Sequence, residues 1–414
     1  MRILHLAAGA GDMLCGACHR DLTLIRELQR RGHQVTVVPL YTPLRHDREL
    51  PTVTPLFYGG VACWLEQHGL TRLPGFAARL LASRPVMAVV GRYAARTRAS
   101  EVGPLAVSML EGGDGRQAIE MERLLAWLAT QPKPEVISLT NALISGLAPA
   151  LRERLGVPVI CAFQGEDDFV DHLGEPWTER AWKLLARNAA QVTRFTAPSQ
   201  RLADDMIRRL GLAADHVRLV PAGLDAETYP LRPLPAGPPT IGYLGVITPR
   251  KGLDVALDAL RQLGDSEARL LVAGQILDPA WVNSLQRDLR RTAIADRVTW
   301  LGEVDWAGKL DFFARCHVVV MPSRFNEARG MVAMEAMASG VPVVVPDCGI
   351  FPELLADGGG LLVPPDDATA LARGLASLLA DPVKAAALGQ AGAASIRQHH
   401  SAAVTADAFL AACA

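Results

Sequence analysis

The sequence lacks the features that would mark a membrane-spanning or nucleic-acid-binding protein. It contains no stretch of about 18 uncharged apolar residues, so we expect no transmembrane segment. It also lacks an excess of charge of either sign, because 42 basic side chains face 43 acidic ones and the formal net charge is -1. No global field therefore attracts nucleic acid or an anionic membrane, and any such partner must be bound by a local patch.

Cysteine is scarce and follows no disulfide framework. The seven cysteines are an odd number scattered over 414 residues, which favours a reducing compartment, and we expect a cytoplasmic protein. The turn Cys15-Gly-Ala-Cys18-His19 has the spacing of a c-type haem attachment and, more loosely, of a redox or zinc pair. The sequence shows no further zinc ligands, and covalent haem does not fit a turn in a cytoplasmic chain. We expect neither a metal nor a resident cofactor.

What the sequence does contain is an alternation of strand and helix patterns. An apolar strand at 2–7, a Gly-rich turn at 9–16, a helical pattern to 31 and a strand at 34–40 form a βαβ unit, which implies a parallel sheet covered by helices. Further strands are expected at 135–139, 157–162, 193–197 and 217–220, with a long, mostly helical insertion at roughly 60–130. At this length we expect two domains.

A proline-rich segment at 229–239 interrupts the alternation and is interpreted as an interdomain linker. Strand patterns then start again at 240–246, 269–274, 297–301, 316–321 and 341–346, so the second half is a second doubly wound α/β domain. Ligands of such sheets bind at the carboxyl ends of the strands. Two facing domains of this kind would place a site in the cleft between them.

Two cations follow the first strand of the second half. Gly245 begins a loop that runs through Arg250 and Lys251 to Gly252 and then into a helix. Beside a helix N-terminus at the mouth of a sheet, these cations suit a diphosphate. An ordinary solvated pair of loop residues is the alternative.

The segment at 322–340 is the most informative in the chain. Its helix, expected at about 330–339, is apolar on every face except at Glu335. A buried carboxylate needs polar partners, which are either ribose hydroxyls or backbone N–H groups of a neighbouring loop. Glu327 lies in the preceding loop, and the N–H groups of residues 328–331 open the helix toward an anion.

These residues resemble the family 4 retaining glycosyltransferases of GT-B fold, in which two facing Rossmann-like domains form the enzyme. The resemblance rests on the two glutamates, Glu327 and Glu335, and the following Ala-Met-Ala-Ser-Gly-Val-Pro-Val-Val. It is supported, in the expected order, by the Gly-rich loop at 9–16, Val217 to Asp225, Lys251-Gly252 and Gly360 to Asp366. The resemblance implies an acceptor domain at 1–228, a donor domain at 229–396 and a C-terminal helix at 397–414 that crosses back to the first domain.

The resemblance also implies roles for single residues. Glu327 would hold hydroxyls of the donor sugar, Glu335 the ribose and Lys251 the departing diphosphate. A second diphosphate-binding arginine is usual where this chain has Val246, and we expect Arg250 or, better, Arg329 to supply its charge. The expected catalytic residues are Lys251, Glu327 and Arg329, and the expected donor-binding residues are Gly245, Arg250, Lys251, Ala328, Gly330, Met331 and Glu335.

The donor itself would be a UDP-, GDP- or ADP-sugar. No Asp-x-Asp occurs in the chain, so a metal-bridged diphosphate site is not indicated, and protein cations must replace the metal. The implied reaction is hexosyl transfer with retention and without a metal.

On the acceptor side the expected residues are Gly11, Gly16, Gln164, Glu166 and Asp167. The family commonly has a histidine where Gln164 stands, and an amide cannot take a proton near neutral pH. In the family the departing phosphate is thought to accept the proton of the acceptor on the same face of the sugar, and the resemblance implies the same here. Glu166 and Asp167 either orient the acceptor or form a solvated acidic loop.

An arginine-rich stretch lies within the insertion. Residues 67–100 contain six arginines and no acidic residue, and the arginines are Arg72, Arg79, Arg84, Arg92, Arg96 and Arg98. The stretch at 72–98 is expected to meet anionic lipid, a phosphate-bearing acceptor or nucleic acid, with a solvated helix face as the alternative.

Two other functions are alternatives to glycosyl transfer. A nicotinamide dehydrogenase would need a third glycine after Gly9-Ala-Gly11 and an acid at the end of the second strand, where the chain has Leu40. The second alternative keeps the fold without the transfer, as a sugar-nucleotide epimerase or hydrolase or a non-catalytic sugar-binding protein. The acceptor stays unidentified in every case.

Overall fold

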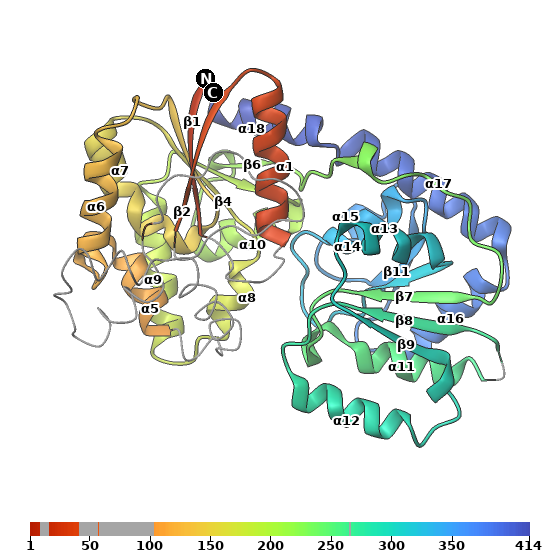
Figure 1. Cartoon of the computed structure of the whole chain (residues 1–414). Helices are drawn as coiled ribbons and strands as arrows, with labels where there is room; N and C mark the ends of the chain where they lie inside the picture. The colour runs from red at the N-terminus through yellow and green to blue at the C-terminus, as the bar shows by residue number, and fades with distance from the viewer. Residues whose placement is uncertain (9–15, 41–56, 58–102, 265) are drawn as a thin grey trace. The chain divides into compact units, whose positions relative to one another are not determined.

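The computed structural model describes residues 1–8, 16–40, 57, 103–264 and 266–414 (Figure 1). The chain divides into two compact units. Unit 1 comprises Met1–Pro221 and Thr405–Ala414, and unit 2 comprises Ala222–Val404. Each unit contains a six-stranded sheet.

The sheet of unit 1 is parallel in every described strand pair and has the order β2-β1-β3-β4-β5-β6. Its strands are β1 Arg2–Ala7, β2 Gln34–Pro39, β3 Val136–Leu139, β4 Val159–Ala162, β5 Arg194–Ala197 and β6 Val217–Leu219. Every residue of β3 and β4 is buried, as expected for strands covered by helices on both faces. The order reverses between β1 and β3, which creates a switch point at their carboxyl ends.

The helices of unit 1 are α1 Gly16–Arg30, α5 Gly103–Glu111, α6 Ala118–Leu128, α7 Ala148–Leu155, α8 Glu166–Asp171, α9 Trp177–Ala189 and α10 Gln200–Leu210. Local chemistry defines their ends, and α10 is an example. The hydroxyl of Ser199 accepts the N–H of Leu202 at 3.2 Å, and Gly211 ends the helix with a φ of 65°.

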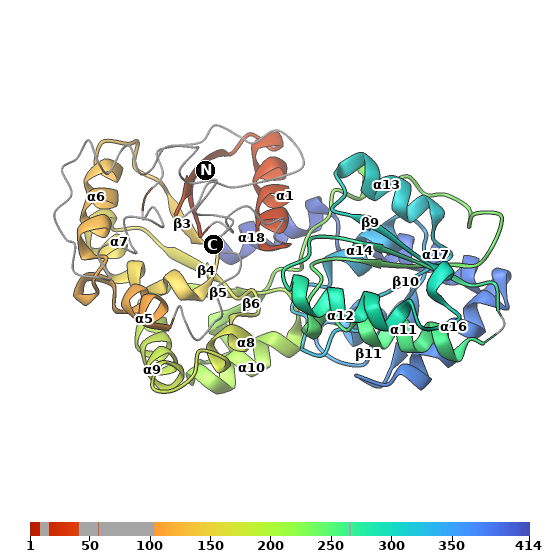
Figure 2. The same cartoon turned by 60° about the horizontal axis from the view of Figure 1, so that its bottom comes forward.

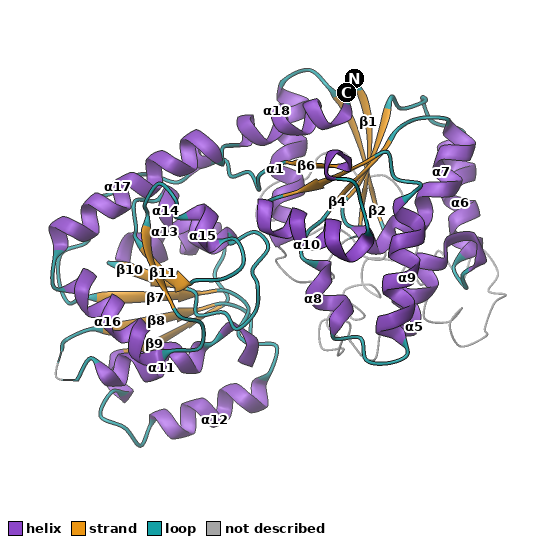
Figure 3. Cartoon of the chain, turned by 180° about the vertical axis from the view of Figure 1, so that it is seen from behind, coloured by secondary structure: helices purple, strands orange, loops and turns teal. Residues whose placement is uncertain are grey.

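The last helix, α18 Ala402–Cys413, brings the end of the chain back to its beginning. Phe409 and Ala412 pack into the same hydrophobic cluster as Ile3 of β1, and Asp407 forms an ion pair with Arg31. The two termini accordingly lie close together in Figures 1 and 3. Because of this packing, Thr405–Ala414 belong to unit 1 although the whole of unit 2, Ala222–Val404, separates them from Pro221 in the sequence.

The sheet of unit 2 is also parallel and has the order β12-β11-β10-β7-β8-β9. Its strands are β7 Thr240–Leu244, β8 Arg269–Ala273, β9 Val298–Gly302, β10 Val318–Val320, β11 Val343–Pro346 and β12 Gly360–Val363. The switch point lies between β7 and β10, so the loops after these two strands share one edge of the sheet.

Helices cover both faces of this sheet, as Figure 2 shows for α11, α12 and α16 and Figure 3 for α14 and α17. They are α11 Leu253–Gln262, α12 Pro279–Leu289, α13 Trp306–Arg315, α14 Met331–Ala338, α15 Phe351–Leu354, α16 Ala368–Leu379 and α17 Pro382–His399. Two hydrophobic clusters result, one containing α14 and the other α11 and α16. In four of these helices an aspartate accepts the N–H three residues later, and these caps are Asp278, Asp305, Asp367 and Asp381.

The structure divides the chain at other points than the sequence pattern. Unit 2 begins at Ala222 rather than after residue 228, because Ala222, Leu224 and Tyr229 are buried in its core. The proline-rich segment at 229–239 is not a free linker, since the N–H of Arg232 donates to the carbonyl of Ser339 at 3.4 Å. At the other end, α17 continues to His399, and unit 1 resumes only at Thr405.

The predicted strands are present with ends shifted by one or two residues, and β12 is an addition. Its short run, Gly360–Val363, follows two glycines with positive φ, and the sequence pattern indicates only the motif from Gly360 to Asp366 there. None of the helices in the described ranges is long and apolar enough to cross a membrane.

Candidate functional site

Two loops meet at the switch point of unit 2. One follows β7 and runs from Gly245 to Gly252, and the other follows β10 and runs from Pro322 to Gly330. Gly252 has a φ of 70°, and a Cβ atom there would lie 2.0 Å from the carbonyl oxygen of Pro322. Only glycine allows this approach, which brings the predicted cations against the predicted glutamate loop.

The centre of the site is the ion pair between Lys251 Nζ and Glu327 Oε1. The hydroxyl of Ser323 donates to the same carboxylate oxygen at 2.7 Å. Burial alone would raise the pKa of Glu327, but the charge and hydrogen bond of Lys251, the hydrogen bond of Ser323 and the charge of Arg329 lower it below its ordinary value. Glu327 is therefore a carboxylate at neutral pH, held beside a lysine.

A second cation stacks beside the first. The guanidinium carbon of Arg250 lies 4.7 Å from the centroid of the Phe325 ring, and Lys251 Nζ lies 4.8 Å from the same centroid. We call Arg250, Lys251, Glu327 and Arg329 the unit 2 cluster. Lys251 and Arg329 act on the Glu327 carboxylate, and Arg250 shares the Phe325 ring with Lys251, so the cluster combines cations for an anionic ligand with an acceptor for its hydroxyl groups.

Arg324 holds the two loops together and was not predicted. Its guanidinium donates to both carboxylate oxygens of Asp254 at 2.9 and 2.8 Å, to the carbonyl of Pro249 at 2.6 Å and to Asp366 at 2.7 Å. The backbone N–H of Arg324 donates to the carbonyl of Arg250 at 2.9 Å. The position of Lys251 thus depends on an arginine of the facing loop.

Glu335 lies in α14 and is buried, with 3% of its surface exposed. Its Oε1 accepts hydrogen bonds from the hydroxyl of Tyr229 at 2.9 Å and from the ammonium of Lys309 at 3.0 Å. Among the described residues its polar partners are thus two side chains, rather than the backbone N–H groups of a neighbouring loop. Sequence reasoning missed both, although Lys309 stands four residues before the buried Phe313, on the apolar face of α13.

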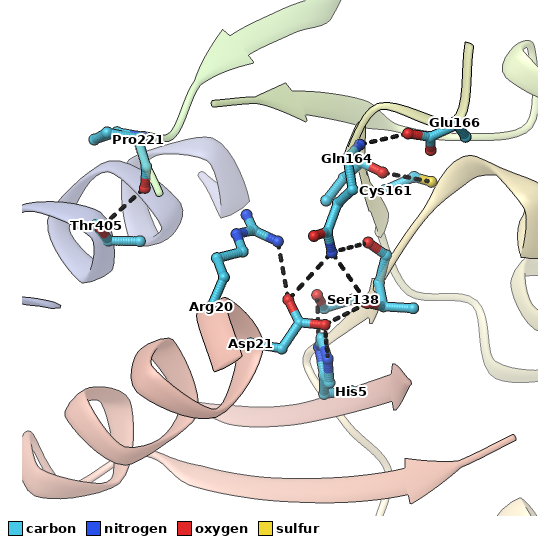
Figure 4. A network of polar contacts seen from close by, with 11 residues as sticks. His5, Arg20, Asp21, Ser138, Cys161, Gln164, Glu166, Pro221 and Thr405 are labelled. Carbon is cyan, nitrogen blue, oxygen red and sulfur yellow. Dashed lines mark hydrogen bonds and ion pairs between the residues drawn. The ribbon is translucent and has the colours of Figure 1, made fainter. Parts of the chain in front are cut away.

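A second polar assembly lies at the switch point of unit 1 (Figure 4). Its centre is Asp21 of α1, which forms an ion pair with Arg20 at 3.0 Å, accepts the hydroxyl of Thr140 and lies 3.4 Å from His5 Nε2. The amide of Gln164, which follows β4, donates to Asp21 Oδ1 at 3.4 Å and to the carbonyl of Thr140 at 2.5 Å. We call this assembly the unit 1 network, and it consists of His5, Arg20, Asp21, Ser138, Thr140 and Gln164, all of them buried.

Two further residues expected on the acceptor side follow Gln164. Both oxygens of Glu166 accept backbone hydrogen bonds, one from Ala142 at 2.6 Å and one from Gln164. Burial raises the pKa of Glu166, and the two backbone hydrogen bonds oppose that rise. Burial also raises the pKa of Asp167. Glu166 therefore braces the loop that carries Gln164 and is not part of a solvated acidic loop.

The remaining predicted residues are placed as follows. Gly245 follows β7, Ala328 lies in the loop after β10, Gly330 precedes α14 with a φ of 59°, and Met331 is the first residue of α14. Gly16 is the first residue of α1. Gly11, Cys15 and the arginine-rich stretch 72–98 lie outside the described residues. Among the described residues, no three His, Cys, Asp or Glu side chains gather as metal ligands would.

Two family models match the chain, one in each half. The model described as "Glycosyl transferases group 1" matches residues 231–395, and the model described as "Glycosyltransferase Family 4" matches residues 77–228. The first match contains the whole unit 2 cluster, and the second contains Thr140 and Gln164.

Curated relatives are about a third identical to the chain over the part that aligns. A phosphatidyl-myo-inositol mannosyltransferase of Mycobacterium leprae is 34% identical over 208 residues, which are 47% of this chain and 53% of the relative. A D-inositol 3-phosphate glycosyltransferase of Xylanimonas cellulosilytica is 31% identical over 220 residues, or 49% of this chain and 52% of the relative. The chain thus spans about half the length of the curated relatives that it matches.

Solved structures match the chain over nearly its full length. HepE of Anabaena, solved in complex with UDP, has a TM-score of 0.71 at 19% identity and covers 99% of both chains. A sucrose-phosphate synthase of Thermosynechococcus elongatus has a TM-score of 0.73 at 20% identity, over 99% of this chain and 98% of the other. At such identities the likeness shows the fold, and it confirms the predicted α/β, GT-B class.

Proposed function

Because this chain belongs to the family 4 glycosyltransferases of GT-B fold, we propose that it transfers a sugar from a nucleotide diphosphate sugar to an acceptor, with retention and without a metal. The observation that carries the proposal is the Lys251–Glu327 ion pair at the switch point of unit 2. In a nucleotide sugar the diphosphate is directly bonded to the sugar, so its binding site needs a cation beside a hydroxyl-binding carboxylate. The pair supplies both.

On the donor side, Lys251 and Arg329 neutralise the charge that grows on the diphosphate as its bond to the sugar breaks. Arg250, stacked on Phe325, is the second candidate for the charge that is missing at Val246. Glu327 accepts hydrogen bonds from sugar hydroxyls. Glu335 accepts them from the ribose, and its contact with Lys309 holds the carboxylate in place for that purpose.

The configuration at the sugar C1 is retained if the diphosphate departs from the same face of the sugar that the acceptor attacks. The bond from the sugar C1 to the diphosphate oxygen breaks, a bond from C1 to the acceptor oxygen forms, and the proton of the acceptor hydroxyl moves to the departing phosphate. Gln164 takes no proton in this scheme, because an amide has no basic site near neutral pH.

The relatives suggest which substrates to test first. We propose UDP-, GDP- and ADP-sugars as the donor panel, since HepE was solved with UDP and a relative in Corynebacterium glutamicum is named as GDP-mannose-dependent. For the acceptor we propose a phosphate-bearing inositol, because two relatives carry phosphatidyl-myo-inositol or inositol 3-phosphate in their names.

A thermal-shift panel of these nucleotides, followed by a release assay, tests the function. A nucleotide that binds only the native state raises the melting temperature. We then expect sustained release of the nucleotide diphosphate that depends on phosphatidylinositol or inositol 3-phosphate. Release that is unaffected by every acceptor would indicate the hydrolase alternative, and nucleotide binding without release would indicate a sugar-binding protein.

We also propose that the protein works in the cytoplasm and attaches peripherally to anionic membranes through residues 72–98. The support is the sequence pattern alone, in which each arginine near an anionic surface contributes about 1 kcal/mol. Co-sedimentation with anionic and neutral vesicles across a salt series tests it, with Arg79, Arg92 and Arg96 changed together to glutamine. Absence of binding to anionic vesicles at low salt would refute the membrane contact.

A further inference from the structure

Asp366, at the end of the motif that begins at Gly360, holds a backbone conformation that favours glycine. Its φ is 57°, and within the described ranges it is the one residue other than glycine with a positive φ. Glycine adopts this conformation readily, whereas the Cβ atom of any other residue makes it unfavourable. Such a conformation persists where the surrounding contacts enforce it. The contacts of the Asp366 side chain therefore explain why an aspartate stands there.

Asp366 directly precedes Asp367, and the two carboxylates serve different elements. The carboxylate of Asp367 caps α16, because it accepts the N–H of Ala370 at 2.8 Å. The carboxylate of Asp366 accepts the Nε–H of Arg324 at 2.7 Å. Arg324 follows β10 and Asp366 follows β12, and β11 lies between these two strands in the sheet. The contact thus joins the loops of two strands that are not neighbours.

The guanidinium of Arg324 is held along two edges. Its two terminal nitrogens donate to the two carboxylate oxygens of Asp254 at 2.9 and 2.8 Å, and its Nε donates to Asp366. With Asp254 alone the planar group could still tilt about that contact, and the second carboxylate fixes its plane. In this plane, one terminal nitrogen also donates to the carbonyl of Pro249 at 2.6 Å.

The same guanidinium is connected to the backbone around Lys251. The carbonyl of Pro249, which Arg324 binds, also accepts the N–H of Gly252 at 3.2 Å. The backbone N–H of Arg324 donates to the carbonyl of Arg250 at 2.9 Å. Lys251 therefore stands in a short turn whose residues on both sides are bound, directly or through Pro249, to one arginine.

We propose that Asp366 is a positioning residue of the donor site, which fixes the plane of the Arg324 guanidinium and, through it, the turn that carries Lys251. The inference rests on the proposed function and deepens it, because it adds the loop after β12 to the site that holds the departing diphosphate. It also predicts an unusual combination of effects. Glycine at this position should relieve the backbone and slow the reaction, whereas a residue that only stabilises the fold would not separate the two.

Asp366→Gly measures that combination. Glycine adopts a φ of 57° readily and an exposed ion pair contributes little to stability, so the urea midpoint of unfolding should stay equal or rise. Turnover should fall about threefold to tenfold with the KM for the donor unchanged, because Lys251 is less well placed for the charge that grows in the transition state. A fall in stability alongside turnover, or an unchanged turnover, would overturn the proposal.

Asp366→Asn is the conservative variant. Asparagine tolerates a positive φ and keeps an oxygen that can accept the Nε–H of Arg324, although without the charge. Its turnover should therefore lie between those of the wild type and Asp366→Gly. An asparagine variant with the full loss would show that the contact with Arg324 is not what places Lys251.

Asp357→Gly provides the matched control. Asp357 lies in the turn before β12, pairs with His399 at 3.3 Å, and has 63% of its side chain exposed, against 58% for Asp366. The control thus removes a similarly exposed, ion-paired aspartate from the opposite end of the same strand. We expect its turnover to equal that of the wild type, and equal losses in the two glycine variants would contradict the proposal.

Lysine labelling follows the position of Lys251 without any transfer reaction. The chain contains five lysines, which are Lys133, Lys183, Lys251, Lys309 and Lys384. Trace acetylation with acetic anhydride, followed by peptide mass spectrometry, gives the reactivity of each, and Lys251 Nζ must leave Glu327 to react. Asp366→Gly should accelerate the labelling of Lys251 about threefold by loosening its turn, with Lys133 and Lys384 unchanged. Equal labelling of Lys251 in variant and wild type would refute the positioning role.

The two measurements also separate this inference from the proposed function. If the wild type transfers sugar to no acceptor, the proposed function fails, and the labelling of Lys251 still decides whether Asp366 positions it. If the wild type transfers sugar and Asp366→Gly does so at the same rate, the inference fails and the proposed function stands.

Discussion

The unit 2 cluster and the unit 1 network occupy the same place in their sheets but are built in opposite ways. In unit 2, Lys251 pairs with Glu327, the charge of Arg329 also acts on this carboxylate, and the side chains of Lys251 and Glu327 keep 27% and 12% of their surface exposed. In unit 1, the polar groups satisfy one another around Asp21, and the side chains of Asp21 and Arg20 are 5% exposed. The first arrangement keeps charged side chains partly exposed, where a ligand can reach them. In the second, the buried carboxylate of Asp21 binds Arg20 and the amide of Gln164.

The largest effect is expected from the loss of Lys251. If that loss had no effect, the contrast between the unit 2 cluster and the unit 1 network would fail. Lys251→Ala should lower turnover by about 10²- to 10³-fold with little change in donor binding, because one donor to a developing charge contributes roughly 3 to 4 kcal/mol in the transition state. Turnover and donor affinity are measured on the same preparation. Lys384→Ala, at an exposed lysine of α17, serves as the control, and an unchanged turnover number would remove Lys251 from the mechanism.

Glu335 tests whether the buried part of unit 2 also binds ligand. Glu335→Gln should weaken nucleotide binding by about tenfold, since charge-assisted hydrogen bonds become neutral ones. Isothermal titration with the nucleotide selected by the thermal-shift panel measures the affinity. Tyr229→Phe removes one partner of the carboxylate but not its charge, so it should affect affinity less. If only the melting temperature fell in Glu335→Gln, this carboxylate would be structural.

A substitution at Arg324 tests whether the unit 2 cluster depends on a residue that holds its loops in place. In unit 1, Asp21 holds Gln164 in a comparable way. Arg324→Lys keeps the charge but loses the paired contact with Asp254, so Lys251 should be less well placed and turnover should fall about threefold to tenfold. Steady-state kinetics measure it against Arg315→Lys, whose partner Asp311 lies on α13. Equal activity of the two variants would show that the loops hold their position without Arg324.

The smallest expected effect concerns the pH dependence of the free energy of unfolding, to which two carboxyl groups contribute with opposite sign. The pKa of Glu327 is lowered from 4.5, so its contribution to the free energy of unfolding is present above pH 4.5 and is lost as the pH falls through the lowered value. The pKa of Glu166 is raised, so its contribution is present below pH 4.5 and is lost as the pH rises through the raised value.

Urea unfolding of the wild type, Glu327→Gln and Glu166→Gln between about pH 3 and pH 7 measures these contributions. The difference between wild type and Glu327→Gln should grow with pH, and that between wild type and Glu166→Gln should shrink. Parallel curves for the two variants would mean that the carboxyl groups of the two units do not differ in this respect.

The donor half of the site was accessible to sequence reasoning because its residues are contiguous. Lys251 stands in one short loop, and Glu327 and Glu335 stand on either side of a helix start with seven residues between them. Arg324 and Lys309 escaped prediction, since a single arginine or lysine is ordinarily a solvated residue. Their contacts with Asp254 and Glu335 cross 70 and 26 residues of sequence.

The sequence by itself determined the two α/β repeats, the strand positions and the donor-side residues Lys251, Glu327 and Glu335. Hydrophobic periodicity and loop chemistry act over short distances along the chain, so a local pattern records them. The tertiary structure alone decided that His5, Asp21, Thr140 and Gln164 form one network and that Glu166 is a brace. These outcomes depend on which strands become neighbours. That choice is set by the burial of the whole sheet, and no local pattern records it.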